Sequence, residues 1–222
     1  MIVEGFTTGV FQSNCYIAAA AESDSAVVID PGQDAAEPLL ARLGALGLRC
    51  EAVLLTHGHI DHIWNAKQVA EFAGVQAWIH PDDMWLLEDP GAALGRMGFG
   101  KLTVDAPEKV AHFADGDVLR YGGLHVTVRH TPGHTPGHCA FLTDGVVFSG
   151  DLIFAGSVGR TDLPRGSMEA LMDSIRRVVL ALPDETTILS GHGAETTVAT
   201  ERTSNPFVVA DARGDLPRLL GL

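Results

Sequence analysis

Cysteine and long apolar runs are scarce in this sequence, and each scarcity excludes a class of protein. The 222 residues include three cysteines, Cys15, Cys50 and Cys139, an odd number at wide spacing that argues against a disulfide framework and favours a reducing compartment. No run approaches the roughly 18 apolar residues that span a bilayer. The N-terminal MIVEGFTTG has neither a basic segment nor a long apolar core, so we expect no signal peptide. We therefore expect a cytoplasmic protein without a membrane partner.

Positive charge is also in short supply. Lysine and arginine total 15 against 28 acidic residues, which gives a formal net charge of −13. A field of this sign repels phosphate backbones, so we expect no nucleic-acid partner. The composition, 46% hydrophobic and 19% charged, is typical of a folded globular chain. No low-complexity linker divides the sequence, and we interpret residues 1–222 as one domain.

The hydrophobic pattern predicts strands that alternate with helices, and hence a layered α/β fold. In the first half we expect helices over 35–47 and 63–73 and strands over 1–6, 14–20, 25–30, 51–56 and 75–79. In the second half we expect a helix over 167–181, short helices over 195–222, and strands over 117–122, 124–131, 138–143, 145–150 and 186–191. The irregular stretch 81–109, which includes Met97 and Phe99, is either a lid or wall of a substrate site or a short helix packed on the core.

The strongest chemical signal is the pattern H-x-H-x-D-H, which follows a predicted buried strand and precedes a predicted helix. His57 and His59 alternate along an extended segment, so their side chains face the same way. Asp61 and His62 start the helix and can face a second point nearby. One metal ion rarely takes four ligands from six consecutive residues without strain. Two neighbouring metal ions therefore explain the pattern better than one.

Three further polar residues follow predicted strands. They are His134, Asp151 and His192, and ligands in layered α/β folds gather at the carboxyl ends of strands. With the first motif they give five imidazoles and two carboxylates. Such a set suits zinc, iron or manganese, and the lack of cysteine in it argues against a structural cysteine-rich zinc site.

The motifs THGHIDH, TPGHTPGH, FSGDLIF and SGHG, in this order, resemble those of the metallo-β-lactamase superfamily. The best match is to the glyoxalase II-type hydroxyacyl-thioester hydrolases, in their short single-domain bacterial form. The resemblance runs from NCYIA, which begins at residue 14, to ERTSNPF, which ends at residue 207. It implies an α/β fold in which two sheets lie between two layers of helices, a four-layer αββα sandwich with the metal site at one edge of both sheets.

The resemblance also implies a role for each motif residue. The first metal ion would be held by His57, His59 and His134, and the second by Asp61, His62 and His192. Asp151 would bridge the two ions together with a water or hydroxide, so that Asp61 and Asp151 are the catalytic carboxylates.

Three residues outside the ligand set receive supporting roles. His138 and Asp30 would support the metal ligands through hydrogen bonds. Arg160 resembles a basic substrate-binding residue of longer relatives, although here Asp162 replaces the tyrosine that follows in them. Arg160 either holds a substrate carboxylate or pairs with Asp162 or Glu201.

The activity implied is hydrolysis of a hydroxyacyl thioester, a small molecule such as S-lactoylglutathione. Two divalent ions would act as cofactor, with zinc preferred over iron or manganese, and a metal-bridging hydroxide would attack the thioester carbonyl. Two alternatives stay open: a persulfide dioxygenase with one iron on His57, His134 and Asp151, and a lactonase. A non-catalytic binding module is disfavoured because no ligand is missing. β-Lactam hydrolysis is disfavoured because the superfamily's β-lactamases usually lack a histidine where His62 stands. The sequence does not indicate the oligomeric state.

Overall fold

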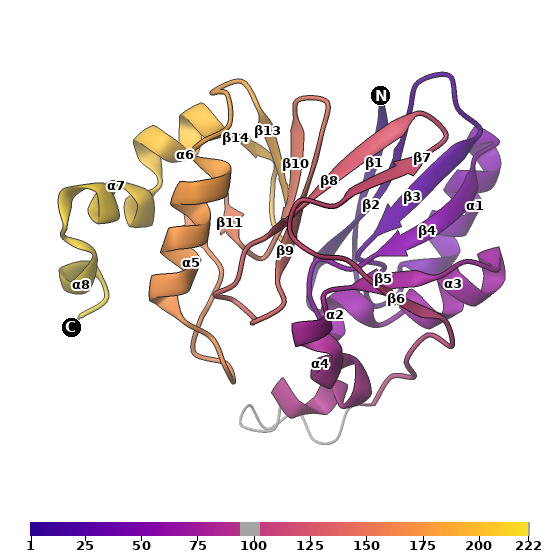
Figure 1. Ribbon diagram of the computed structural model, residues 1–222, viewed down its shortest axis with the longest axis horizontal. Coiled ribbons are helices and arrows are strands. Elements are labelled where there is room, and N and C mark those ends of the chain that lie inside the picture. Colours follow the sequence, from indigo (N-terminus) through magenta and orange to yellow (C-terminus); the bar gives the residue numbers. More distant parts are fainter. Residues whose placement is uncertain (94–102, 222) are drawn as a thin grey trace.

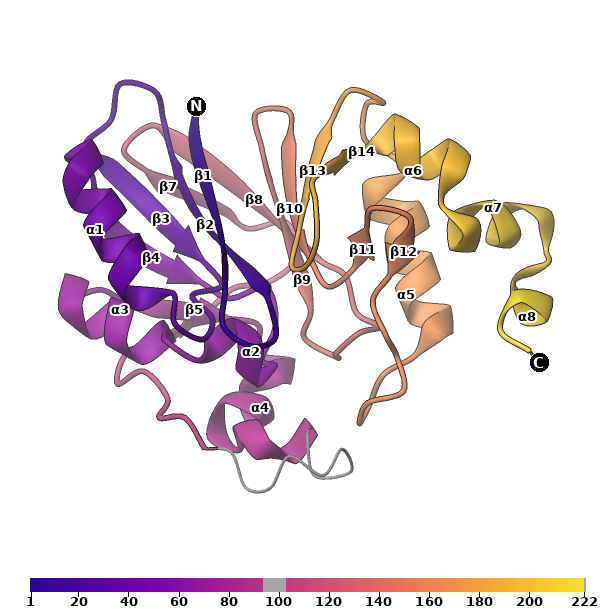
Figure 2. The same cartoon turned by 180° about the vertical axis from the view of Figure 1, so that it is seen from behind.

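Two six-stranded sheets face each other, and helices cover the outer face of each (Figures 1 and 2). The computed structural model describes residues 1–93 and 103–221. The order of layers is helices, sheet, sheet, helices. This confirms the predicted four-layer αββα sandwich.

The first sheet is built from the N-terminal half of the chain. Its strands lie in chain order: β1 (Ile2–Thr8), β2 (Ser13–Ala19), β3 (Ser25–Ile29), β4 (Arg49–Leu54), β5 (Ala77–Ile79) and β6 (Val110–His112). The first three strands pair antiparallel, and β3 to β6 pair parallel. The helices of this half are α1 (Ala36–Leu46), α2 (Ile60–Ile63), α3 (Ala66–Ala73) and α4 (Met84–Glu88), with 3₁₀ turns η1 (Pro81–Asp83) and η2 (Pro90–Ala93).

The second sheet has the strand order β14-β13-β10-β9-β8-β7. Its strands are β7 (Val118–Tyr121), β8 (Leu124–His130), β9 (Cys139–Thr143), β10 (Val146–Gly150), β13 (Thr187–Ser190) and β14 (Thr196–Thr197), with a separate hairpin of β11 (Ile153–Phe154) and β12 (Ser157–Val158). The helices of this half are α5 (Met168–Ser174), its π-helical continuation η3 (Ile175–Val179), α6 (Val198–Ser204), α7 (Pro206–Arg213) and α8 (Leu216–Leu219).

Three apolar cores hold these layers together. Successive side chains of a strand point to opposite faces, so neighbouring residues of a central strand enter different cores. In β3, Val28 packs towards α1 and α3, whereas Val27 packs between the two sheets. Val147 of β10 joins the third core, against α5. Near-continuous apolar runs are therefore required in these strands, as expected for sheets covered on both faces.

Two helix boundaries lie where the sequence signals predict them, whereas one predicted helix differs from the structure. Gly47, with φ 68°, ends α1, and the Ser167 hydroxyl accepts a hydrogen bond from the backbone N–H of Ala170 at the start of α5. The predicted helix over 63–73 is wrong in its extent, because α2 and α3 are separated at Asn65. The N–H of Asn65 donates to the carbonyl of Pro31 at 2.8 Å, and its side-chain oxygen accepts from Ala35 N–H at 3.1 Å. Asn65 thus connects to α1 instead of continuing a helix.

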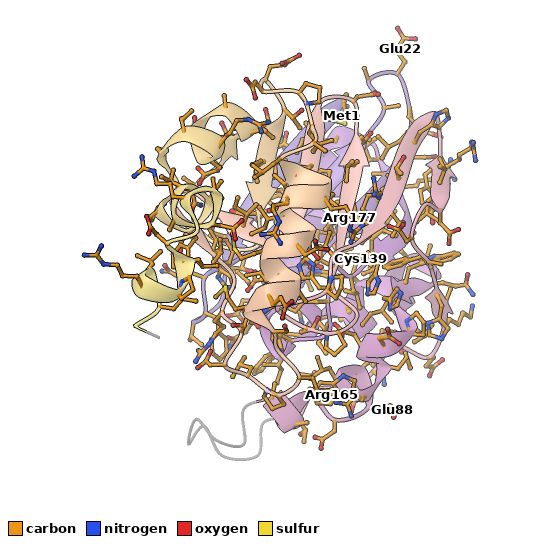
Figure 3. The ribbon with its side chains drawn as sticks, turned by 60° about the vertical axis from the view of Figure 1, so that its left-hand side comes forward. Met1, Glu22, Glu88, Cys139, Arg165 and Arg177 are labelled. Atoms are coloured by element: carbon orange, nitrogen blue, oxygen red, sulfur yellow. The ribbon has the colours of Figure 1, made fainter. Side chains whose placement is uncertain are left out.

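Within the stretch 81–109, the short helix packed on the core is present as α4. Leu86 and Leu87 of α4 are buried in the molecule, whereas Ala93 in η2 lines a cavity. Met97 and Phe99 lie outside the described residues. Arg165 lies at the α4 edge of the molecule (Figure 3), where its guanidinium carbon is 4.4 Å from the centre of the Trp85 ring.

Within residues 1–93 and 103–221, no helix combines the length and the apolar character needed to cross a membrane.

Candidate metal centre

The seven ligand candidates meet at one edge of both sheets. Four of them, His57, His59, Asp61 and His62, come from the loop after β4 and the first turn of α2. The other three follow strands of the second sheet: His134 comes after β8, Asp151 directly after β10, and His192 two residues after the end of β13. The site therefore lies on the seam between the two halves of the fold.

The first cluster consists of three histidines. The ligand nitrogens of His57, His59 and His134 lie within 4.8 Å of one another. His59 Nδ1 is 2.8 Å from His134 Nε2, and His57 Nε2 is buried with no hydrogen-bond partner among the described residues. An unpartnered buried nitrogen is costly unless a ligand satisfies it. Three inward-facing imidazole nitrogens fit a metal ion of the zinc or iron type.

The second cluster combines one carboxylate with two histidines. Asp61 Oδ2 lies 3.2 Å from His192 Nε2 and 3.5 Å from His62 Nε2. The two Nε2 atoms are 3.4 Å apart. All three ligand atoms lie within 4.8 Å of one another, so a second metal ion could be held next to the first.

Asp151 stands between the two clusters. Its Oδ2 lies 3.5 Å from His134 Nε2 of the first cluster and 3.6 Å from His192 Nε2 of the second. Its Oδ1 is 3.4 Å from His62 Nε2, yet no well-formed hydrogen bond from the described residues reaches this buried oxygen. A carboxylate in this position has oxygens facing both clusters.

Oxygen acceptors fix the orientation of four of the histidine rings. His134 Nδ1 lies 2.7 Å from the carbonyl of Arg160, and His192 Nδ1 lies 3.2 Å from that of Gln12. A carbonyl only accepts, so each Nδ1 carries the proton and each Nε2 keeps its lone pair. The outer partners of metal-binding histidines act in this way.

Asp30 and Thr56 orient two further rings in the same way. Asp30 accepts hydrogen bonds from the Thr56 N–H at 2.7 Å, the Thr56 hydroxyl at 2.6 Å and His62 Nδ1 at 3.0 Å. Because the Thr56 hydroxyl gives its proton to Asp30, it accepts from His57 Nδ1 at 3.0 Å. Both Asp30 oxygens are thus used in holding the ligands in place. Asp30 itself has a left-handed backbone, with φ 48°.

His138 contacts the backbone of Asp151. Its Nε2 accepts a hydrogen bond from the N–H of Asp151 at 3.1 Å, and its Nδ1 is 2.8 Å from the Thr131 hydroxyl. The ring is completely buried. His138 therefore lies behind the site, where it positions the turn that carries Asp151.

Burial and charge divide the histidines into two groups. Burial, reinforced by neighbouring imidazoles, lowers the pKa of His57 and His138 well below the ordinary histidine value and that of His59 to about 3. Burial also disfavours the charged form of His62, but Asp61 and Asp151 outweigh it and raise the pKa of this ring. Burial likewise opposes ionisation of Asp151, yet His62 and His134 hold its pKa below the usual range. The carboxylates stay ionised, as metal ligands must.

A cavity of about 320 Å³ opens in front of these residues. Its polar wall is made of ligand candidates and Arg160, and its apolar wall comprises Phe11, Ile60, Ala93, Phe154, Val158 and Leu163. The Arg160 guanidinium donates two hydrogen bonds to Asp162, both at 2.7 Å. The structure thus places Arg160 at the cavity in its paired form, and Glu201 instead accepts from Gly156 N–H and Asn205.

Sequence reasoning missed one buried acid next to the site, Asp83. Its side chain accepts hydrogen bonds from the backbone N–H groups of Gly58 and Gly137. These glycines lie in the two loops that carry the first cluster. No local pattern distinguishes Asp83 from its neighbour Asp82, so only the tertiary structure could reveal it.

Residues 8–192 match the family model of the metallo-beta-lactamase superfamily, and the chain belongs to this superfamily. An uncharacterised protein of Mycobacterium leprae is 43% identical over 216 residues, which are 94% of this chain and 99% of that protein. A Haemophilus influenzae protein named hydroxyacylglutathione hydrolase GloC is 38% identical over 211 residues, 94% of this chain and 98% of its own length.

Solved structures extend the comparison. BLEG-1, described as a B3 metallo-beta-lactamase, superposes with a TM-score of 0.85 at 35% identity, covering 93% of this chain and 99% of its own. TTHA1623 in a di-iron-bound form gives 0.79 at 40% identity, covering 92% and 99%. ETHE1 from Myxococcus xanthus gives 0.80 at 27% identity, covering 100% and 90%.

Proposed function

We propose that the protein is a metal-dependent hydrolase of hydroxyacyl thioesters that holds two divalent ions. The observation that carries the proposal is the pair of adjacent ligand clusters with Asp151 between them. The kinship with a protein named hydroxyacylglutathione hydrolase supports the substrate class. The di-iron form of TTHA1623 supports a site for two ions, and iron or manganese is compatible with the same donors as zinc.

In this proposal each of the two clusters holds one metal ion. His57, His59 and His134 hold one ion, and Asp61, His62 and His192 hold the other. Two bound ions would supply hydroxide at neutral pH and polarise a carbonyl. The carboxylates of Asp61 and Asp151 would balance the positive charge of the ions, and Asp151 faces both clusters.

The cavity beside the ligands would bind the acyl group. Its apolar wall, which includes Ile60 and Phe154, excludes water from the carbonyl that is cleaved. A thiol has a pKa of about 8.5, so a thiolate leaves without a strong general acid.

A second candidate is supported by the similarity to ETHE1. In it, one iron would be held by His57, His134 and Asp151, and the protein would act as a persulfide dioxygenase. His62 and His192 would then take no direct part in the chemistry. The two candidates differ in metal content and in their need for dioxygen.

The test begins with elemental analysis of protein purified without added metal. It continues with a panel of S-lactoylglutathione, a lactone, a β-lactam and a persulfide. We expect close to two ions per chain and hydrolysis of the thioester without oxygen consumption, abolished by chelation. One iron per chain with oxygen consumed on the persulfide would replace the hydrolase by the dioxygenase. Preferred turnover of the β-lactam, in line with the name of BLEG-1, would overturn the assignment of substrate.

A further inference from the structure

Asp83 is a fully buried acid that no cation contacts within hydrogen-bond distance among the described residues. Its side chain has no exposed surface, whereas that of the adjacent Asp82 is 60% exposed. Burial raises the pKa of Asp83 above the ordinary aspartate value, although the hydrogen bonds that it accepts act in the opposite direction. A buried carboxylate is retained only where its hydrogen bonds compensate the loss of water.

Three donors meet this carboxylate, and all three belong to loops that carry ligand candidates. Oδ2 accepts from the N–H of Gly58 at 2.9 Å and from the hydroxyl of Thr135 at 2.6 Å. Oδ1 accepts from the N–H of Gly137 at 2.7 Å. Gly58 separates His57 from His59, and Thr135 directly follows His134. A single side chain therefore connects the two loops of the first cluster.

Both loops also pack closely against the segment that holds Asp83. A side chain at Gly58 would place its Cβ 2.6 Å from Leu86 Cβ, and one at Gly137 would place it 2.6 Å from Asp83 N. Real Cβ atoms do not approach so closely, so the two loops reach the Asp83 carboxylate only because these positions are glycine. The contact thus depends both on the Asp83 carboxylate and on the two glycines that face it.

We propose that Asp83 is a positioning residue that sets the separation of the two loops and, through it, the metal affinity of the first cluster. This rests on the proposed function in one respect, since it requires that the first cluster bind a metal ion. Asp83 touches none of the seven ligand side chains through its hydrogen bonds, and it acts on them through Gly58, Thr135 and Gly137. The second cluster has outer partners of its own, Asp30 for His62 and Gln12 for His192, and none of the hydrogen bonds of Asp83 reaches them.

The variant that tests the proposal is Asp83→Asn, which preserves shape. Its NH₂ group must face either Gly137 N–H or the Gly58 and Thr135 donors, so a donor meets a donor. We expect the affinity of one of the two sites for Zn²⁺ to fall by about 10- to 100-fold, the usual effect of losing an outer partner, while the other site is retained. The bound metal is first removed from the protein with a chelator. The metal-free protein then competes with a chromophoric chelator for Zn²⁺ that is added stepwise, which gives the Zn²⁺ affinity of each site.

Glu88→Gln is the matched control, because it removes an exposed acid of α4, outside every cluster of potential metal ligands, and its Zn²⁺ titration should coincide with that of the wild type. The amide proton signals of Gly58 and Gly137 give a second measurement, and both should move upfield in Asp83→Asn. Thr135→Val, which removes one donor only, provides a milder variant if Asp83→Asn does not fold.

Three outcomes are informative. Reduced stability with wild-type Zn²⁺ affinity in the folded fraction would make Asp83 a merely structural residue and overturn the proposal. An equal loss at both sites would overturn it as well. A wild-type protein that binds no metal would instead refute the proposed function, and this is seen before any variant is made.

Discussion

The Nε2 atom of His138 accepts a hydrogen bond from the backbone N–H of Asp151, 3.1 Å away. A protonated imidazole has no lone pair and could not accept it, so this contact requires the neutral ring. Burial also favours the neutral ring, because it lowers the pKa of His138 well below the ordinary value. The turn that carries Asp151 is thus supported by a histidine that must stay neutral.

The unfolding free energy of the metal-stripped protein should therefore depend on His138 below pH 6.5. In the unfolded chain this residue takes up a proton near pH 6.5 and in the folded chain it does not, so its contribution is complete above that pH and is lost as the pH falls. His138→Gln should reduce the fall in stability between pH 6.5 and pH 5 by up to about 1.4 kcal/mol per pH unit. Urea denaturation at several pH values measures this slope, and an unchanged slope would contradict the neutral ring.

Gly191→Ala should weaken metal binding. A Cβ at this position would lie 2.7 Å from Cε1 of His62 and would collide with Oδ1 of Asp151, so the carboxylate must move away from both clusters. We expect metal affinity to fall at least about tenfold. Gly44→Ala in α1 is the matched control, because its Cβ meets nothing within 4 Å. That variant should bind metal normally and gain about 0.5–1 kcal/mol of stability from improved helix propensity.

Asp162→Asn should widen substrate choice towards acidic thioesters. Asp162 holds the Arg160 guanidinium by two hydrogen bonds, which lower the pKa of Asp162 to about 2. The pair is exposed and thus weak, so releasing Arg160 should raise kcat/KM for S-lactoylglutathione, relative to an uncharged lactoyl thioester, by only about three- to fivefold. Asp184→Asn breaks a comparable pair with Arg202 elsewhere and should leave the ratio unchanged. A ratio that also stays constant in Asp162→Asn would exclude Arg160 from substrate selection.

Asp151→Ala and His62→Ala should separate a hydrolase with two ions from an enzyme with one. Asp151 faces both clusters, so its loss should lower metal-dependent turnover at least about a hundredfold. The circular dichroism spectrum should remain that of the folded protein. His62→Ala should lower the metal content from two ions to one and cause a similar loss of thioester hydrolysis. Full activity in either variant would refute the two-ion proposal, whereas retained oxygen uptake in His62→Ala would favour the dioxygenase.

The sequence predicted best what depends on neighbouring residues. The spacing from His57 to His62 and the strands before His134, Asp151 and His192 are local patterns, and the structure brings these residues together. The αββα layers follow from the family motifs, and α1 begins and ends close to its predicted bounds. The positions of the ligands could thus be anticipated without knowledge of their contacts.

Features that rest on distant contacts escaped prediction. The break between α2 and α3 arises because Asn65 bonds to Pro31 and Ala35, which lie about thirty residues earlier in the chain. Asp83 meets Gly137 across 54 positions. The two-residue strands β11, β12 and β14 are too short to show an alternation of apolar and polar residues. These are consequences of tertiary packing, which no window of sequence contains.

Because the site lies between the two halves of the fold, its two clusters can form only in a set order as the chain is synthesised. The first cluster cannot exist until residue 134 has joined residues 57 and 59, and the second needs residue 192, well over a hundred positions after residue 62. Contacts this distant in sequence form late, after both halves have acquired their strands. With two ions bound as proposed, capture of the second ion would report that synthesis has passed residue 192 and that the two halves have docked, and metal content would then measure completed folding.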